Sequence, residues 1–211
     1  MPVDFEEMFA PAHTAVLTME VQRGVVGDLS ALPALSQAAE DVGLFASIRE
    51  LLRAARSAGV PVVHCTAGPD KVPDAPPNYP GAAAMAKRRA AGGGGEGPGF
   101  AELVVDIGPE PTDLVVERHH GITPFTGTEL DAVLRRLGTR TVVACGVSLN
   151  VGIIGLSVEA VSLGYRVAVA LDAVVGVPVE YGKAVIEHTL PFVATRLSVA
   201  DLRSVWSKSG T

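Results

Sequence analysis

Polar side chains that could take part in catalysis follow several apolar segments of the sequence. A glutamate follows the first of these segments and an arginine follows the third, so a carboxylate and a guanidinium would be available to transfer protons and to bind an anion. Amide, imidazole and hydroxyl groups that could contact a substrate lie at similar places. The candidate set comprises Glu20, Gln22, His64, Arg118, His119, Ser148 and Asn150.

A glycine occupies the position where the sequence pattern calls for a nucleophile. Residues 141–153 are typical of a buried strand that runs through a tight turn into a helix. A thiol at that turn would meet the positive end of the helix, which favours the thiolate. Because the chain has Gly152 there, we predict chemistry that does not use a cysteine at this position.

The two cysteines and the paired histidines do not form a metal-binding pattern. Cys65 and Cys145 are far apart in the sequence, and both lie in apolar, strand-like runs. We expect Cys145 to belong to the core, and we keep Cys65 as a candidate for a relocated nucleophile. His119 and His120 are adjacent, so on an extended segment they point to opposite faces and chelate poorly. We predict neither a catalytic metal nor another cofactor.

The elements that must position these residues alternate between strands and helices. Such alternation, with strands rich in Val, Ala and Leu, is typical of a parallel sheet covered on both faces. We therefore predict an α/β, three-layer doubly wound fold with a six-stranded, mainly parallel sheet, in one domain over residues 1–211. Ligands bind at the carboxyl ends of strands in this fold. Strands are expected at 14–19, 60–65, 114–117, 141–146, 166–171 and 193–197, and helices at 35–57, 128–137, 151–163, 179–190 and 198–206.

A segment rich in proline and glycine, around residues 68–105, interrupts the alternation. Its glycines, concentrated between Gly92 and Gly99, resist ordering. One interpretation is a mobile surface loop. The other is a lid over the ligand crevice, in which Lys87, Arg88 or Arg89 would meet an acidic ligand. The glycines do not form a phosphate-binding loop, because no Lys-Ser/Thr pair follows them.

Composition and charge limit the partners. The chain has 211 residues, 48% of them apolar, and a net charge of -6, which is ordinary for a soluble globular protein. An acidic chain argues against nucleic acid and against an anionic membrane as partners. No apolar run reaches the roughly 18 residues of a membrane span, and the acidic N-terminus does not resemble a signal peptide. We expect a reduced, cytoplasmic protein.

Four segments of the chain resemble the isochorismatase-like hydrolases. Residues 14–22 are similar to the first strand of that family, and residues 113–131 resemble its lysine strand with the Phe-x-Gly-Thr-x-Leu turn. Residues 146–152 and 160–173 resemble the segments that follow. Most members hydrolyse amides with an Asp, Lys, Cys triad. Those three positions correspond here to Glu20, Arg118 and Gly152, so the resemblance implies the fold but a replaced triad.

The resemblance also leaves two hypotheses for function. True isochorismatases are similar in having glycine at the cysteine position, and they hydrolyse a vinyl ether by protonation. By analogy, Glu20 would be the acid or base and Arg118 would bind the anionic group of a small molecule. A nearby guanidinium opposes protonation of a carboxylate, however. The alternative is a catalytically inactive member, with a structural Glu20–Arg118 ion pair, that retains a ligand pocket or an assembly role.

Further expectations follow from the same resemblance. Relatives often have a cis peptide at the position of Val147–Ser148, and they usually form dimers or tetramers. The nicotinamidase-type metal motif Asp-x-His-x-x-His is absent from residues 64–70. Gln22, His64, His119, Ser148 and Asn150 are the expected substrate contacts. Other roles stay open. His64 could form hydrogen bonds that support the residues in contact with the substrate, Asn150 could hold the junction loop, and His119 could cap a loop.

Overall fold

The sheet has six strands, all parallel, in the order β3-β2-β1-β4-β5-β6. The computed structural model describes residues 4–72, 75–91 and 98–208. This architecture confirms the predicted α/β fold and its sheet. The first and fourth strands have the bounds that the sequence predicts, and the second is shifted by two residues. The strands are β1 (Thr14–Met19), β2 (Val62–Ala67), β3 (Leu114–Arg118), β4 (Thr141–Gly146), β5 (Arg166–Val174) and β6 (Thr195–Leu197).

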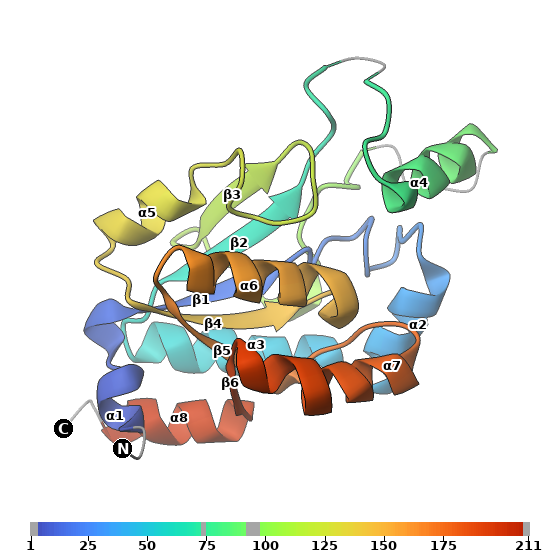
Figure 1. Ribbon diagram of the computed structural model, residues 1–211. Coiled ribbons are helices and arrows are strands. Elements are labelled where there is room, and N and C mark those ends of the chain that lie inside the picture. The colour runs from blue at the N-terminus through green and yellow to red at the C-terminus, as the bar shows by residue number, and fades with distance from the viewer. Residues whose placement is uncertain (1–3, 73–74, 92–97, 209–211) are drawn as a thin grey trace.

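Helices cover both faces of the sheet (Figure 1). The α-helices are α1 (Phe5–Met8), α2 (Pro33–Asp41), α3 (Leu44–Ser57), α4 (Pro80–Ala90), α5 (Leu130–Arg136), α6 (Ile154–Ser162), α7 (Val179–Ala184) and α8 (Val199–Lys208). Short helical turns are η1 (Pro11–His13), η2 (Val105–Ile107), η3 (Leu149–Ile153), η4 (Val185–Thr189) and η5 (Leu190–Phe192).

The single helix predicted over 35–57 is wrong, because two helices occupy this stretch. Gly43 lies between them with a φ of 65°. This left-handed conformation is readily accessible to glycine and ends a helix. The last helix begins as predicted: Asp201 N–H donates to Ser198 Oγ at 3.1 Å, and Asp201 Oδ2 accepts from Ser198 N–H at 2.9 Å, which is a reciprocal capping arrangement.

The alternation of side chains along the strands divides the core into two layers. Val16, Val62 and Val143 point to the layer that contains α2, α3 and α8. Leu17 and Val63 point to the opposite layer, which contains α5 and α6. Successive strand residues face opposite sides of a sheet, so the parity of a position decides which layer its side chain enters. This parity matters for the candidate site residues.

The carboxyl ends of the central strands lie side by side. Met19 pairs with Cys65 of β2 and with Gly146 of β4, and Ala67 pairs with Arg118 of β3. The residues after β1, β3 and β4 therefore emerge along one edge of the sheet, as expected for this fold. No helix among the described residues is long and apolar enough to cross a membrane.

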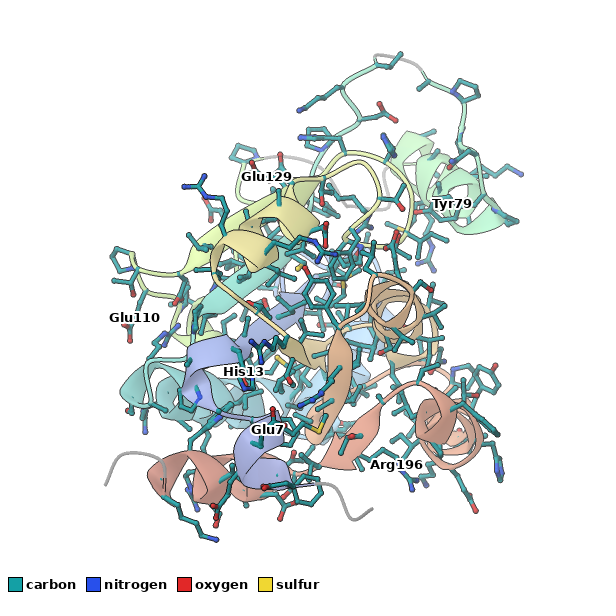
Figure 2. The ribbon with its side chains drawn as sticks, turned by 60° about the vertical axis from the view of Figure 1, so that its left-hand side comes forward. Glu7, His13, Tyr79, Glu110, Glu129 and Arg196 are labelled. Atoms are coloured by element: carbon teal, nitrogen blue, oxygen red, sulfur yellow. The ribbon has the colours of Figure 1, made fainter. Side chains whose placement is uncertain are left out.

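The region predicted as a loop contains a helix, α4, which lies at one end of the molecule beside Tyr79, whereas Glu7 on α1 lies towards the other end (Figure 2). Arg88 Nη1 of α4 donates to the Ala31 carbonyl at 2.8 Å, which attaches this helix to the body. The chain then returns beside β1, where Gln22 and Leu103 form an antiparallel bridge. Residues 92–97 of the predicted lid lie outside the described residues, and the lid role stays a prediction.

Candidate functional site

Glu20 lies directly after β1 in a left-handed backbone conformation. Its φ is 50°, the only positive φ of a non-glycine residue in the described part of the chain. Its N–H donates to the Cys65 carbonyl at 2.9 Å, so the neighbouring strand holds this turn in place. Such a conformation costs roughly 1 to 2 kcal/mol for a residue with a Cβ. The cost draws attention to Glu20, because strained residues cluster at functional sites.

Arg118, the last residue of β3, contacts Glu20 directly. Its Nη2 donates to Glu20 Oε1, and its Nε donates to the Gly121 carbonyl at 3.1 Å. The arginine side chain is 9% exposed and that of Glu20 is 18% exposed. The third nitrogen, Nη1, is buried and has no hydrogen-bond partner among the described residues. Glu20 Oε2 likewise has no partner in the described part of the chain. The ion pair therefore keeps one donor nitrogen and one acceptor oxygen unused.

Gly152 lies in η3, between β4 and α6, and its Cα approaches β1 closely. A Cβ placed on Gly152 would lie 3.0 Å from the Val147 carbonyl oxygen and 3.2 Å from Cε of Met19. The turn begins with the Val147–Ser148 peptide, which is cis, as the resemblance implies. Even a Cβ at position 152 would therefore crowd the Val147 carbonyl and the Met19 side chain. The bare turn lies on one side of β1, and Arg118 approaches Glu20 from the other.

Gln22, two residues after Glu20, connects three segments of the chain. Its Nε2 donates to the carbonyls of Ala67 at 2.9 Å and Ala101 at 3.0 Å, and its Oε1 accepts from Ala67 N–H at 2.7 Å. The residue is fully buried. These bonds satisfy both donors of the amide and occupy its oxygen. Gln22 therefore positions the ends of β1 and β2 and the returning chain, and its amide donors are not available to a substrate in this structure.

His64 belongs to a different cluster, on the α3 side of the sheet. Its Nδ1 lies 2.7 Å from Thr18 Oγ1, and its Nε2 lies 3.1 Å from Asp113 Oδ2. Arg56 of α3 donates to the same carboxylate. Burial lowers the pKa of His64, although Asp113 opposes this effect. Both ring nitrogens are occupied within the protein, so this geometry corresponds to the supporting role rather than to a substrate contact.

Sequence reasoning missed Asp113 in this cluster. It precedes β3, at the end of the sheet away from Glu20. Burial alone would raise the pKa of Asp113, but hydrogen bonds from Arg56, from the Glu110 N–H and from His64 outweigh it and lower this pKa. The sequence contained one signal for this cluster. His64 is two residues from Val62 and shares its face of the strand, so its partners were to be expected on the α3 side of the sheet.

The remaining candidate residues surround the site in different ways. His119 Nδ1 lies 2.8 Å from the Pro69 carbonyl, and its Nε2 lies 3.3 Å from Glu117. Asn150 Nδ2 donates to the Val177 carbonyl at 2.7 Å, in the loop after β5. The Ser148 carbonyl accepts from the N–H of Ile153 at 3.1 Å. These contacts hold loops at the edge of the sheet and leave any contact with substrate as a prediction.

The environment of both cysteines opposes a thiolate. Burial raises the pKa of Cys65 to about 12 and also raises the pKa of Cys145. The nearby Arg118 charge lowers the pKa of Cys65, but burial is the larger effect. A thiol with such a pKa is protonated at neutral pH and is a poor nucleophile. Within the described ranges, no group of three or more His, Cys, Asp or Glu side chains is arranged to hold a metal ion.

The parallel sheet and its helices define an α/β protein whose fold is similar to that of a cysteine hydrolase from Pseudomonas syringae, with a TM-score of 0.75 and 19% identity over 99% of this chain and 96% of the other. The family model of the isochorismatase domain matches residues 14–201, and the chain belongs to this family. It is 43% identical over 86 residues to the uncharacterized isochorismatase family protein YwoC of Bacillus subtilis, a match that covers 40% of this chain and only 44% of that relative.

Two further comparisons cover more of the chain. It is 29% identical over 173 residues to the ureidoacrylate amidohydrolase RutB of Azorhizobium caulinodans, covering 77% of this chain and 76% of that protein. The crystal structure of an isochorismatase family protein from Desulfovibrio vulgaris has a TM-score of 0.73 and 26% identity, covering 92% of this chain and 98% of the other. The family and its fold are therefore shown over most of the sequence.

Proposed function

We propose that this chain is a hydrolase that acts on a small, anionic molecule without a cysteine nucleophile. The buried, unpartnered Nη1 of Arg118 carries the proposal. A buried donor without a partner costs free energy, and a charged donor costs more than a neutral one. A carboxylate or phosphate on a ligand would satisfy it, because the guanidinium fork binds such groups through two nitrogens.

Glu20 is the proposed proton-transfer group. Once a substrate anion binds Arg118, the guanidinium charge is shared between two anions, which makes it easier for Glu20 to accept a proton. Oε2 of Glu20 then takes a proton from a water molecule as the water oxygen bonds to the substrate. The same proton moves to the leaving group as the bond to that group breaks, so Glu20 ends as it began. The step uses neither cysteine, in agreement with the raised pKa of Cys65.

The name of one relative is compatible with this substrate class. Ureidoacrylate amidohydrolase RutB is named for a substrate that is itself a carboxylate. A carboxylate-bearing amide or ureido compound is therefore the first class to test here, beside enol ethers. Gly152 replaces the usual nucleophile, so the proposal requires direct attack of water on such a substrate.

A second candidate function is that of an inactive member with a structural ion pair. Two observations favour it. Glu20 and Arg118 contact each other directly, and they line none of the four cavities of about 250 to 700 Å³ that open elsewhere on the molecule. In this alternative the ion pair fills the former active site and the protein retains a binding or assembly role.

A substrate screen with matched variants separates the two candidates. Small amides, ureido acids, esters and enol ethers, each with and without a carboxylate, are incubated with the wild type and with Glu20→Gln, Arg118→Gln and Gly152→Cys. We expect turnover of carboxylate-bearing compounds only, lost in Glu20→Gln. Arg118→Gln should raise KM for these compounds, because it removes the charged group that binds the carboxylate. No turnover of any compound by the wild type or by any variant would support the inactive alternative. Amidase activity confined to Gly152→Cys would show that only the nucleophile is missing.

We also propose that the chain assembles as a homodimer or homotetramer in a reducing, cytoplasmic compartment. Val151, Val158 and Val161 are exposed at helical spacing along η3 and α6, and such an apolar surface suits a second copy. Both cysteines are free, which fits a reducing compartment. Val158→Asp should lower the sedimentation mass, whereas Val105→Asp, at an exposed valine on η2, should not. An unchanged mass in Val158→Asp would refute this interface.

A further inference from the structure

A second polar feature of the molecule lies away from the ion pair of Glu20 and Arg118. A groove of about 700 Å³ opens beside α3 and α8, which are neighbours in the lower half of Figure 1. This volume is within the roughly 300 to 1,000 Å³ of small-molecule sites. Neither Glu20 nor Arg118 lines this groove, so it is separate from the Glu20–Arg118 site. Its polar and aromatic lining consists of Arg49, Glu50, Arg53, Ser57, Arg203, Trp206 and Ser207.

The groove is positive within an acidic protein. Three arginines and one glutamate line it, an excess of two positive charges, whereas the whole chain has a net charge of -6. Arg49, Arg53 and Ser57 are four residues apart along α3 and therefore share one face of the helix. Arg203 and Ser207 have the same spacing on α8. Two polar stripes thus face the groove from neighbouring helices.

Most of the guanidinium groups have unused donors. Arg53 makes no hydrogen bond or ion pair with any residue in 4–72, 75–91 or 98–208. Arg49 uses only Nε, which donates to the Asp106 carbonyl. Arg203 Nη1 contacts Glu50, the single carboxylate of the lining. The donors of Arg49 and Arg53 are therefore available to an anion.

We propose that this groove binds a small molecule with two or more adjacent phosphoryl groups. Arg49 and Arg53 are one helical turn apart, about 6 Å, so they can each contact one of two linked phosphoryl groups. Arginine binds phosphate oxygens through two parallel hydrogen bonds. The hydroxyl of Ser57 adds a neutral donor at the end of the α3 stripe, whereas that of Ser207 already donates to the Ser204 carbonyl at 2.9 Å. This binding site goes beyond the proposed hydrolytic function and does not depend on it.

The chain contains a built-in reporter for this site. Trp206 lines the groove and is the only tryptophan of the sequence. Inorganic pyrophosphate is titrated against the full chain at low ionic strength, with tryptophan fluorescence and calorimetry measured in parallel. Calorimetry decides if the fluorescence does not change. ADP and citrate, titrated in the same way, distinguish a nucleotide from free pyrophosphate and a phosphoryl site from a carboxylate site.

The matched variants are Arg53→Gln in the groove and Arg136→Gln, which removes the same charge from α5. We expect saturable binding of pyrophosphate that is weakened at least about fivefold by Arg53→Gln and changed less than about twofold by Arg136→Gln. Glu50→Gln should tighten binding, because it removes the opposing carboxylate. The proposal is overturned by calorimetry that detects no saturable binding, by equal weakening in the two arginine variants, or by citrate binding more tightly than pyrophosphate. Glu20→Gln should bind pyrophosphate as the wild type does, so failure here and failure of the hydrolase proposal are distinguishable.

Discussion

Two polar clusters, one at the carboxyl edge of the sheet and one on its α3 side, differ in how completely their hydrogen bonds are made. In the cluster of Thr18, His64, Asp113 and Arg56, none of the side-chain atoms is a buried donor or acceptor without a partner. In the pair of Glu20 and Arg118, a buried nitrogen has none. A buried network whose hydrogen bonds are all made stabilises and specifies a fold. A buried polar group without a partner is one that a ligand can satisfy.

The two clusters also lie at different places along the strands, and this difference bears on their functions. Both clusters contain a carboxylate, a cation and residues of neighbouring strands. Glu20 holds a left-handed backbone conformation at the carboxyl edge of the sheet, where ligands bind in this fold. Asp113 lies before β3, and the N–H of Glu110 supports its carboxylate at 2.8 Å. The difference predicts that changes at Glu20 act on turnover and changes at Asp113 act on stability.

The largest expected effect is on turnover. Glu20→Gln should lower kcat at least about 100-fold on the substrate found in the screen, because an amide cannot accept the proton. Asp113→Asn should change kcat less than about threefold in the folded fraction. Steady-state kinetics on both variants, with the folded fraction measured by circular dichroism, checks this contrast. Similar losses of kcat in the two variants would contradict the distinction.

The next effect is on the free energy of unfolding. Asp113→Asn should lower it by about 2 to 4 kcal/mol, because an amide NH2 would face the donors of Arg56, His64 and the Glu110 N–H. Glu20→Gln keeps an acceptor for Arg118 and should cost about 1 kcal/mol. Urea denaturation at pH 7 gives both values. Glu110→Gln, at an exposed carboxylate that also contacts Arg56, is the control and should cost less than about 0.5 kcal/mol.

A smaller loss of stability is expected at the bare turn. Gly152→Ala adds a Cβ 3.0 Å from the Val147 carbonyl oxygen, so the backbone or Met19 must shift, at a cost of about 1 to 3 kcal/mol. Gly164→Ala adds a Cβ that meets no atom within 4 Å, but at a φ of 93°, and so measures the backbone effect alone. Thermal unfolding of the two variants compares crowding with conformational cost. Stabilisation by Gly152→Ala would contradict the tight fit at this position.

The fold was predictable from the sequence because its signals are local. The apolar runs of β1 and β4 have the same bounds in the sequence pattern and in the structure. The break at Gly43 was missed, because the apolar spacing of α3 continues backwards into α2. The helix α4 was missed as well, since the surrounding prolines and glycines outweighed its alanines.

The candidate site was less predictable, because hydrogen bonding between distant segments decides which polar groups remain available. The sequence places Glu20 and Arg118 at one edge of the sheet, and they are in contact. It also suggested Gln22 and His64 as substrate contacts, but their polar atoms bond to Ala67, Ala101, Thr18 and Asp113. Strand parity could have assigned His64 to the α3 side. Nothing local indicates that Gln22 would bind a chain segment 79 residues away.

The smallest effect tests the satisfied cluster through pH. Burial lowers the pKa of His64 in the folded protein, below the value of about 6.5 in the unfolded chain. The unfolded state therefore binds the additional proton first, so the stabilising effect is complete above about pH 6.5 and is lost as the pH falls towards the folded pKa. Between pH 7.5 and 5.5 the wild type should lose about 1 kcal/mol that His64→Gln does not lose. His188→Gln, at an exposed histidine of η4, should keep the wild-type dependence. Urea denaturation across this range measures all three proteins, and a wild-type slope in His64→Gln would show that folding does not change the proton affinity of the imidazole, against the satisfied neutral arrangement inferred for this face of the sheet.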